Sequence, residues 1–401
     1  MFSILSMGHA RGKASRKDKM VIHGIISDRH DDEEEEKEVP EEEVTPTTTT
    51  TTTAATTPIP RLATHHNPPK SKKENRVSKQ IHALKSILDS IRSWNTTGHE
   101  EMSWWLQFLN RSCEPYSHLY SIGSSVQNRE LWVIALSDHP EIHEIGEPEV
   151  KIIGNIHGNE NVGREVILHM VDHICANIDS DPDLRAIVEN IRIHFLPSLN
   201  PDGIFDLLFS DHGKNIGRLN ANGVDLNRNF PDQFFPSFHD PEPETQAVMK
   251  WMETIPFMLS AALHDGAFGK CVFDSVVTYP FDDSPSGQTK YSATPDDDIF
   301  RYLARLYAET HPEMHLSNMG NCTRYSQHKK FIGGITNGAE WSSLSNTMQD
   351  YNYVQTNCFE IAVEMSCITH LNSSTLSTIF QQNYPSLLGF IRQVFYHFLL
   401  H

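Results

Sequence analysis

The chain has 401 residues, of which 38% are hydrophobic, and this content can bury the core of one domain of about 300 residues. Its 33 basic and 52 acidic residues give a net charge of −19, which disfavours binding to nucleic acid. No apolar run reaches the length of a membrane-spanning helix, so no transmembrane segment is predicted.

The first 75 residues do not have the composition of a folded core. An acidic run, DDEEEEKEVPEEE, occupies residues 31–43, seven threonines follow at 47–53, and a proline-rich stretch continues to Pro69. Such a segment has too little apolar surface to fold, so residues 1–75 are predicted to be a disordered linker or tail. The next stretch, residues 77–91, has its apolar residues on one helical face and predicts a short amphipathic helix.

Two segments then have strand character. LYSIGSSVQNRELWVIALS has two alternating halves around residues 123–128, which predicts a pair of neighbouring strands. Lys151, Ile152 and Ile153 read as the end of a buried strand, followed by a turn-rich loop over 154–161 and a helix over 162–174.

The loop after this strand places His157 and Glu160 three positions apart, which is a metal-ligand spacing. A neutral imidazole and a carboxylate suit a catalytic zinc ion, but a third ligand must come from elsewhere in the chain. The alternative is that both are solvated loop residues, as most such pairs are.

Five further blocks follow in order: HFLPSLNPDGIFDLLF, GRLNANGVDLNRNFPDQF, EPETQAVMKW, LSAALHDG and MQDYNYVQTNCFEIAVEMSC. Together with the first block they resemble the zinc metallocarboxypeptidases, in the regulatory branch that contains carboxypeptidases D, E, M and N. The resemblance runs from Glu101 to Val394. It implies a catalytic domain over residues 76–398, without the transthyretin-like domain that follows in many relatives. That domain is expected to act as a monomer.

The fold implied is a single α/β domain with a mixed, twisted central sheet and helices on both faces. The site is expected at the carboxyl ends of the strands, where open α/β sheets collect ligands. By resemblance, His264 is the third ligand beside His157 and Glu160, and the three hold one Zn²⁺ per chain. The family has glycine where this chain has Asp265, and the interval from His264 to Tyr279 is about seven residues longer than in relatives.

The resemblance also implies the roles of the residues that act on the substrate. Glu364, which alternation places on the face of a strand opposite Ile361 and Val363, is the expected general acid and base. Arg218 is expected to polarise the scissile carbonyl and to stabilise the oxyanion. Asn227 and Arg228 are expected to bind the free C-terminal carboxylate, for which a planar guanidinium is well suited.

The pocket for the leaving side chain is expected to contain Asp282 and Gln349, positions that favour Lys or Arg in relatives. The expected function is therefore zinc-dependent removal of a C-terminal, basic residue from peptides or proteins. An intracellular enzyme that trims acidic, tubulin-like tails is an alternative, but Asp282 would repel an acidic side chain.

One block departs from the family. Where relatives have a mobile, substrate-covering tyrosine this chain has Ser342, and two glycines are replaced by Asn346 and Thr347. This predicts weaker substrate binding with intact metal and base, and it leaves open a catalytically weak or inactive peptide-binding or scaffold protein.

The resemblance implies an extracellular or secretory-pathway protein, and four N-x-S/T sequons, at Asn95, Asn110, Asn321 and Asn372, suit a glycoprotein. The first twenty residues, however, lack the apolar core of a secretory signal. Two explanations of the missing signal are open: a misassigned start or truncated gene model, or a product that stays inside the cell. By resemblance, two of the six cysteines, Cys322 and Cys358, are expected to pair in an oxidising compartment.

Overall fold

The core of the fold is a mixed β-sheet. A computed structural model describes residues 98–204, 216–235, 240–266, 275–316, 331–366 and 373–398, all within one unit that spans residues 70–401. Within these residues eight strands pair in the order β1-β2-β4-β3-β5-β8-β6-β7. In chain order they are β1 (Ser117–Ser124), β2 (Glu130–Leu136), β3 (Glu149–Gly154), β4 (Arg192–Leu196), β5 (Phe257–His264), β6 (Val276–Tyr279), β7 (Ile335–Asn337) and β8 (Phe359–Glu364).

The strand directions determine where functional residues can meet. β1 and β2 are antiparallel, with Tyr120 opposite Val133, which confirms the predicted strand pair. β3 is parallel to β4 and β5, and β5 is parallel to β8. Because β3, β5 and β8 are adjacent and run the same way, the residues that follow them emerge at one edge of the sheet.

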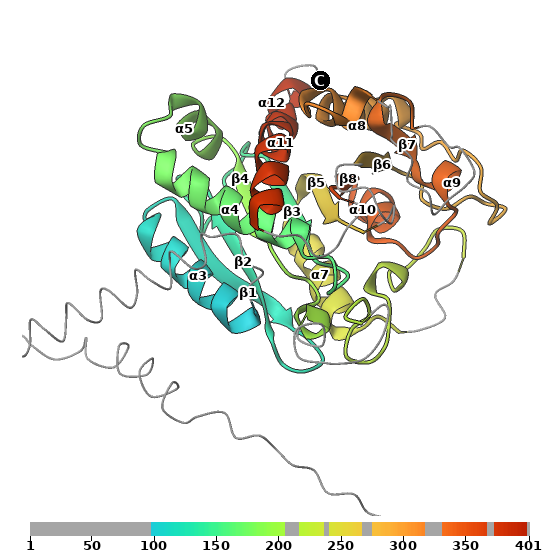
Figure 1. The fold of residues 1–401 in the computed structure, drawn as a ribbon, viewed down its shortest axis with the longest axis horizontal. Helices are drawn as coiled ribbons and strands as arrows, with labels where there is room; N and C mark the ends of the chain where they lie inside the picture. The colour runs from blue at the N-terminus through green and yellow to red at the C-terminus, as the bar shows by residue number, and fades with distance from the viewer. Residues whose placement is uncertain are drawn as a thin grey trace, which may run out of the picture. The chain divides into compact units, whose positions relative to one another are not determined.

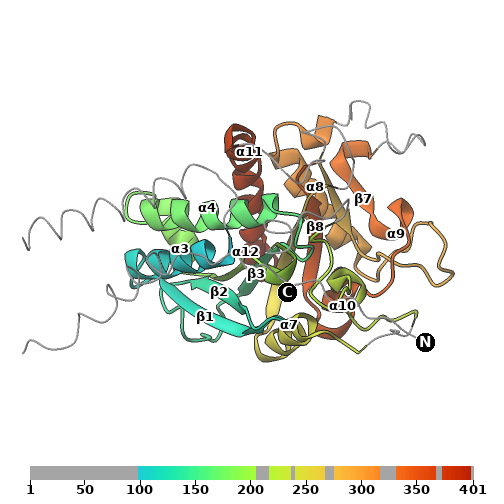
Figure 2. The ribbon, with the colours of Figure 1, turned by 60° about the horizontal axis from the view of Figure 1, so that its bottom comes forward.

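Helices cover both faces of this sheet (Figures 1 and 2). One apolar cluster joins α3, α4, α5, α8, α11 and α12 to the sheet, and a second joins η1, α7 and α10 to the other face. In chain order the helices are α3 (His99–Ser112), α4 (Val162–Asn177), α5 (Pro182–Val188), η1 (Leu226–Arg228), α7 (Pro243–Thr254), α8 (Asp297–Thr310), η2 (Met314–Leu316), η3 (Ile332–Gly334), α9 (Gly338–Trp341), α10 (Met348–Thr356), α11 (Ser373–Ile391) and α12 (Gln393–Phe398).

The alternation of side chains along each strand produces the two clusters. Ile152 and Ala261 contribute to the first cluster, whereas the next residues, Ile153 and Ala262, contribute to the second. Successive side chains of a strand point to opposite faces, so a strand covered on both faces is apolar throughout. The expected α/β architecture, with helices on both faces of a mixed sheet, is therefore confirmed.

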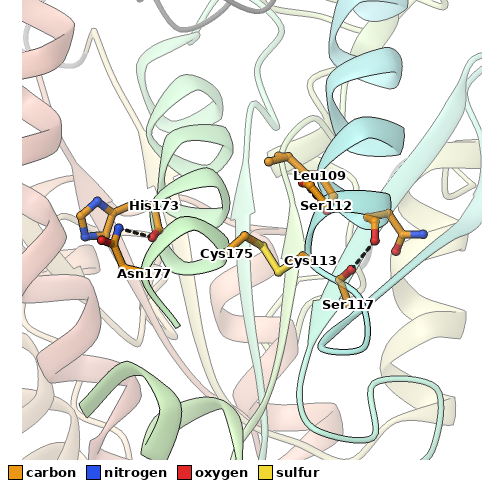
Figure 3. The surroundings of a disulfide bond; sticks show 8 residues. Leu109, Ser112, Cys113, Ser117, His173, Cys175 and Asn177 are labelled. Atoms are coloured by element: carbon orange, nitrogen blue, oxygen red, sulfur yellow. Dashed lines mark hydrogen bonds between the residues drawn. A yellow bond between two sulfur atoms is a disulfide. The ribbon is translucent and has the colours of Figure 1, made fainter. Parts of the chain in front are cut away.

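A disulfide bond joins the end of α3 to α4. Cys113, directly after α3, is bonded to Cys175 near the end of α4, with an S–S distance of 2.06 Å (Figure 3). The expected Cys322–Cys358 pairing is wrong, because Cys358 is a buried free thiol that lies 3.2 Å from the Lys151 ammonium nitrogen. Cys322 itself lies outside the described residues.

We expect this disulfide to contribute strongly to stability. It closes a separation of 62 residues, and the loop-closure entropy removed from the unfolded chain corresponds to about 4 kcal/mol. Urea unfolding of Cys113→Ser should show a loss of this size, whereas Cys358→Ser, which removes a free thiol, should cost far less. Equal losses from the two variants would contradict a stabilising disulfide.

Several expectations fall outside the described residues. These are the N-terminal segment 1–75, the helix at 77–91, most of the longer interval after His264, and the sequons at Asn95, Asn321 and Asn372. The fourth sequon, Asn110, lies inside α3, and its side-chain oxygen is buried. Among the described helices, none combines the length and the apolar content needed to cross a membrane.

Candidate metal centre and substrate pocket

The three expected metal ligands lie together at the carboxyl edge of the sheet. His157 and Glu160 belong to the loop between β3 and α4, and His264 is the last residue of β5. The Nδ1 atom of His157 is 2.8 Å from Oε1 of Glu160, and the Nδ1 atom of His264 is 2.9 Å from Oε2 of the same carboxylate. All three side chains are buried.

The local sequence holds this loop in place. Asn155, fully buried and at a positive φ of 57°, donates through its amide to the carbonyl oxygens of His157, Gly158 and Glu160, at 2.9 to 3.1 Å. Asparagine tolerates this left-handed conformation better than most residues. The turn that presents the ligand pair is therefore built from the side chain of the residue that follows the strand.

The donor set fits a zinc ion. Two imidazole nitrogens and a carboxylate oxygen all lie within 4.8 Å of one another, and three such ligands leave a coordination position for water. Burial opposes charge on His264, but the Glu160 carboxylate raises its pKa to about 9. Burial likewise disfavours ionisation of Glu160, yet His157 and His264 hold its pKa far below the usual range. The ionised Glu160 carboxylate thus stabilises positive charge beside it.

Asp225, which the sequence analysis did not single out, links the metal ligands to the arginines. Its Oδ1 is 3.0 Å from Nε2 of His157, and its Oδ2 accepts hydrogen bonds from Arg218 at 2.9 and 3.2 Å. A carboxylate on the far nitrogen of a ligating histidine fixes the orientation of the ring. Its position in the DLNRNF block, two residues before Asn227, is the signal that could have identified it.

Arg218 is fixed by two acids. Besides Asp225, its Nη1 donates to Oε1 of Glu160 at 3.3 Å, and its side chain is 32% exposed. The guanidinium is therefore anchored at the metal ligands and still reaches solvent. A partly open cation at this place can contact a carbonyl oxygen of a bound peptide.

Asn227 and Arg228 lie next to this cluster in the short helix η1. The Asn227 side-chain oxygen accepts the N–H of Met348 at 2.9 Å, and Arg228 donates to the Asn227 carbonyl. Burial lowers the pKa of the Arg228 guanidinium, and the charges of Asp225 and Asp282 oppose that shift. The charge of Arg228 thus interacts both with Glu160 of the metal cluster and with Asp282, which is expected in the side-chain pocket.

Glu364 ends β8 directly beside the metal ligands, since it pairs with His264 in the parallel register of β5 and β8. Its Oε2 is buried and makes no hydrogen bond to any described residue. Burial raises the pKa of Glu364 to about 7, with a further contribution from the charge of Glu160. A carboxyl group with a pKa near neutrality can both accept and return a proton.

Asp282 and Gln349, the expected pocket residues, contact each other: the Gln349 amide donates to Oδ1 of Asp282 at 2.9 Å. Burial raises the pKa of Asp282 to about 6, whereas Arg228 and His264 lower it. The backbone of α9 approaches closely, since a Cβ on Gly338 would overlap Oδ1 of Asp282. Only glycine fits there with this carboxylate in place.

Asp350, a second residue that the sequence analysis missed, is hydrogen-bonded to the segment that carries Asp282. Its carboxylate accepts the backbone N–H groups of Asp282 and Asp283 at 2.8 and 3.3 Å, and the Gln233 amide at 3.2 Å. It is 1% exposed. One buried acid thus holds the segment that carries Asp282 against α10, which carries Gln349.

The departures from the family are accommodated by specific contacts. Asn346 adopts a positive φ of 62°, and its amide donates to the Phe230 carbonyl at 2.8 Å. Thr347 is the N-cap of α10 and accepts the N–H of Asp350 at 3.3 Å. Ser342 is the C-cap residue of α9 and is half-buried. The two residues in place of glycine therefore connect this loop to Phe230, two residues after Arg228, and to the first turn of α10.

Comparison with known proteins decides the family. Residues 102–386, more than half of the chain, match the model of the zinc carboxypeptidase family. The chain belongs to the zinc carboxypeptidases. This zinc carboxypeptidase is 46% identical to carboxypeptidase D of Anas platyrhynchos over 290 residues, which are 72% of the chain and 20% of that relative. It is 39% identical to carboxypeptidase M of Mus musculus over 300 residues, covering 74% of the chain and 65% of the relative.

Solved structures have the same fold at low sequence identity. Bovine thrombin-activatable fibrinolysis inhibitor in complex with tick carboxypeptidase inhibitor superposes with a TM-score of 0.60 at 15% identity, covering 76% of this chain and 99% of that one. Carboxypeptidase A from Helicoverpa armigera gives 0.59 at 17% identity, covering 79% and 80%. The zinc carboxypeptidase chain spans about a fifth of the length of the carboxypeptidase D relatives that it matches.

Proposed function

We propose that this chain hydrolyses the C-terminal peptide bond of peptides or proteins, and that it prefers Lys or Arg as the residue released. The pairing of Asp282 with Gln349 beside Arg228 is the observation that carries this proposal. A carboxylate in a partly buried pocket favours a cationic side chain, because that cation neutralises a charge that is costly to desolvate.

The chain's own groups would act in turn on a bound peptide. Arg228 and Asn227 would bind the terminal carboxylate, and Arg218, held by Asp225, would donate to the carbonyl oxygen as it gains negative charge. A zinc ion held by His157, Glu160 and His264 would supply a Lewis acid and lower the pKa of a water molecule. Glu364 would accept the proton of that water and deliver it to the leaving amine.

The disulfide bears on where the enzyme works. Cys113 and Cys175 are bonded, and disulfides persist in oxidising compartments such as the secretory pathway and the extracellular space. This supports a secretory-pathway or extracellular enzyme that acts on peptide or protein C-termini, and it disfavours the intracellular alternative. Glycosylation and a monomeric state remain expectations.

We expect Asp282→Asn to reduce the preference for basic residues. With wild type, kcat/KM on matched peptides should fall in the order Arg or Lys, then Phe, then Glu, because Asp282 attracts a cation and repels an anion. Neutralising Asp282 should lower the ratio of Arg to Phe by about tenfold or more, since the charge pair is lost from a partly buried site.

Asp283→Asn is the matched comparison for this experiment. Its carboxylate already accepts the Ser343 hydroxyl at 2.6 Å and the Ser284 N–H at 2.7 Å, so its neutralisation should change the ratio much less. An Arg to Phe ratio that stays the same in Asp282→Asn would exclude Asp282 from the pocket.

We expect Arg228→Ala to abolish the selectivity for a free C-terminus. The kcat/KM for a peptide with a terminal carboxylate should fall about 100-fold, mainly through KM, because a charged group loses its buried partner. Cleavage of the matching amidated peptide should change little. Arg185→Ala, which removes a surface arginine paired with Asp179 at 2.7 Å, is the control and should leave both rates unchanged.

A further inference from the structure

Asp265 is a buried acid that contacts both elements of the metal centre. It follows His264 directly and is 1% exposed. Its Oδ2 accepts the backbone N–H of Val162 at 2.7 Å, and its own N–H donates to Oε2 of Glu160 at 3.4 Å. Asp265, directly after the candidate ligand His264, is thus hydrogen-bonded both to the candidate ligand Glu160 and to the first residue of α4.

Helix α4 depends on this contact for its first turn. Asn161 occupies the N-cap position, but its side chain makes no capping hydrogen bond. The first N–H groups of a helix have no partner within the helix and need an acceptor from outside. Asp265 supplies that acceptor from the end of β5.

The start of α4 also packs tightly against β5. A Cβ on Gly163 would lie 2.6 Å from Cβ of Leu263 and 2.9 Å from its carbonyl oxygen, so only glycine lets the start of α4 rest on β5. Residues 162 and 163 therefore contact residues 265 and 263, respectively. The loop that carries His157 and Glu160 is fixed to the strand that carries His264 by two neighbouring contacts.

The second carboxylate oxygen of Asp265, Oδ1, is buried and makes no hydrogen bond with the part of the chain that the structure describes. An unpaired buried polar atom opposes folding, so the fold alone does not account for an acid here. Among the described residues, the carboxylate accepts one hydrogen bond, from the N–H of Val162, which lies two residues from Glu160.

We propose that Asp265 is a positioning residue for the metal centre: by capping α4 from the end of β5, it holds His157 and Glu160 at the distance from His264 that divalent zinc requires. This inference rests on the proposed zinc site, but it concerns zinc affinity and can be tested without measuring hydrolysis. Residues that orient metal ligands typically change metal affinity by about 10- to 100-fold when they are replaced.

The test is a chelator competition that measures the zinc dissociation constant of wild type, Asp265→Ala and Asp265→Asn. Asp265→Ala removes the acceptor and should weaken zinc binding by about tenfold or more. Asp265→Asn keeps an oxygen acceptor of the same shape, and asparagine caps helices about as well as aspartate, so it should stay within about threefold of wild type. In the metal-free proteins, hydrogen exchange at the Val162 amide should be slow in wild type and Asp265→Asn, and faster in Asp265→Ala.

Glu244→Ala is the matched control. Glu244 is also fully buried and its carboxylate also accepts a backbone N–H, that of Val126 at 3.0 Å, but it lies at the start of α7. Its removal should leave the zinc dissociation constant unchanged.

Three results would overturn the inference. The first is an unchanged zinc affinity in Asp265→Ala. The second is an equal loss in Asp265→Asn, because the negative charge and not the hydrogen bond would then determine affinity. The third is rapid hydrogen exchange at the Val162 amide of the wild type. This measurement needs no variant, so it applies even if Asp265→Ala does not fold. Wild type that binds no zinc would instead contradict the proposed function.

Discussion

Glu364→Gln is expected to lose turnover by about 100- to 10,000-fold while it keeps zinc and peptide binding, which is the range of general acid and base catalysis. The glutamine side chain has the same shape but cannot accept the proton of the attacking water or return it to the leaving amine. Because Glu364 is not among the three candidate ligands, zinc content should not change. Steady-state rates on a peptide that ends in Arg, with zinc content and peptide affinity measured on the same samples, check this.

Glu360→Gln is the matched control for that experiment. Glu360 lies on the same strand, four residues earlier, and is fully buried, but its carboxylate accepts the Ser260 hydroxyl and the Asn352 amide. It should retain turnover. Equal, near-zero rates in wild type and Glu364→Gln, with intact zinc and peptide binding, would favour the alternative of a non-catalytic peptide-binding protein on this fold.

Local sequence patterns predicted the strand and the helix on either side of the His157 loop, whereas His264 and Glu364 entered the expected site by resemblance. The strand that ends at Gly154 and the helix that begins at Val162 both form where the apolar spacing predicts them. The strands that end at His264 and Glu364 are parallel neighbours, so their last residues meet the His157 loop at one edge of the sheet. Periodicity and the direction of strands in an α/β sheet thus determine much of the site.

The supporting contacts depend on chain segments that no local pattern relates. Asp225 contacts a histidine 68 residues away, and Asp350 accepts N–H groups from residues 67 and 68 positions earlier. Each is an acid in a polar block, which in sequence looks like a solvated residue. Disulfide connectivity is hidden for the same reason, since the spacing of six cysteines does not specify which pair lies close in space.

His264→Ala is expected to remove zinc from the protein. Wild type should bind about one zinc ion per chain through three side chains, whereas two remaining ligands do not hold a catalytic zinc firmly. The loss should be large because His157 and Glu160, 2.8 Å apart, would be the two candidate ligands left of the three. Metal analysis after dialysis measures this directly.

Thermal unfolding gives an independent reading of the same prediction. A ligand that binds only the folded state stabilises it by about 4 kcal/mol at a thousand times its dissociation constant, so added zinc should raise the Tm of metal-free wild type. It should raise that of Glu364→Gln equally, because the three ligands are intact, and leave that of His264→Ala almost unchanged. Zinc content and a Tm shift in His264→Ala that match the wild type would show that His264 does not bind the metal, and the His157, Glu160 and His264 site would then be wrong.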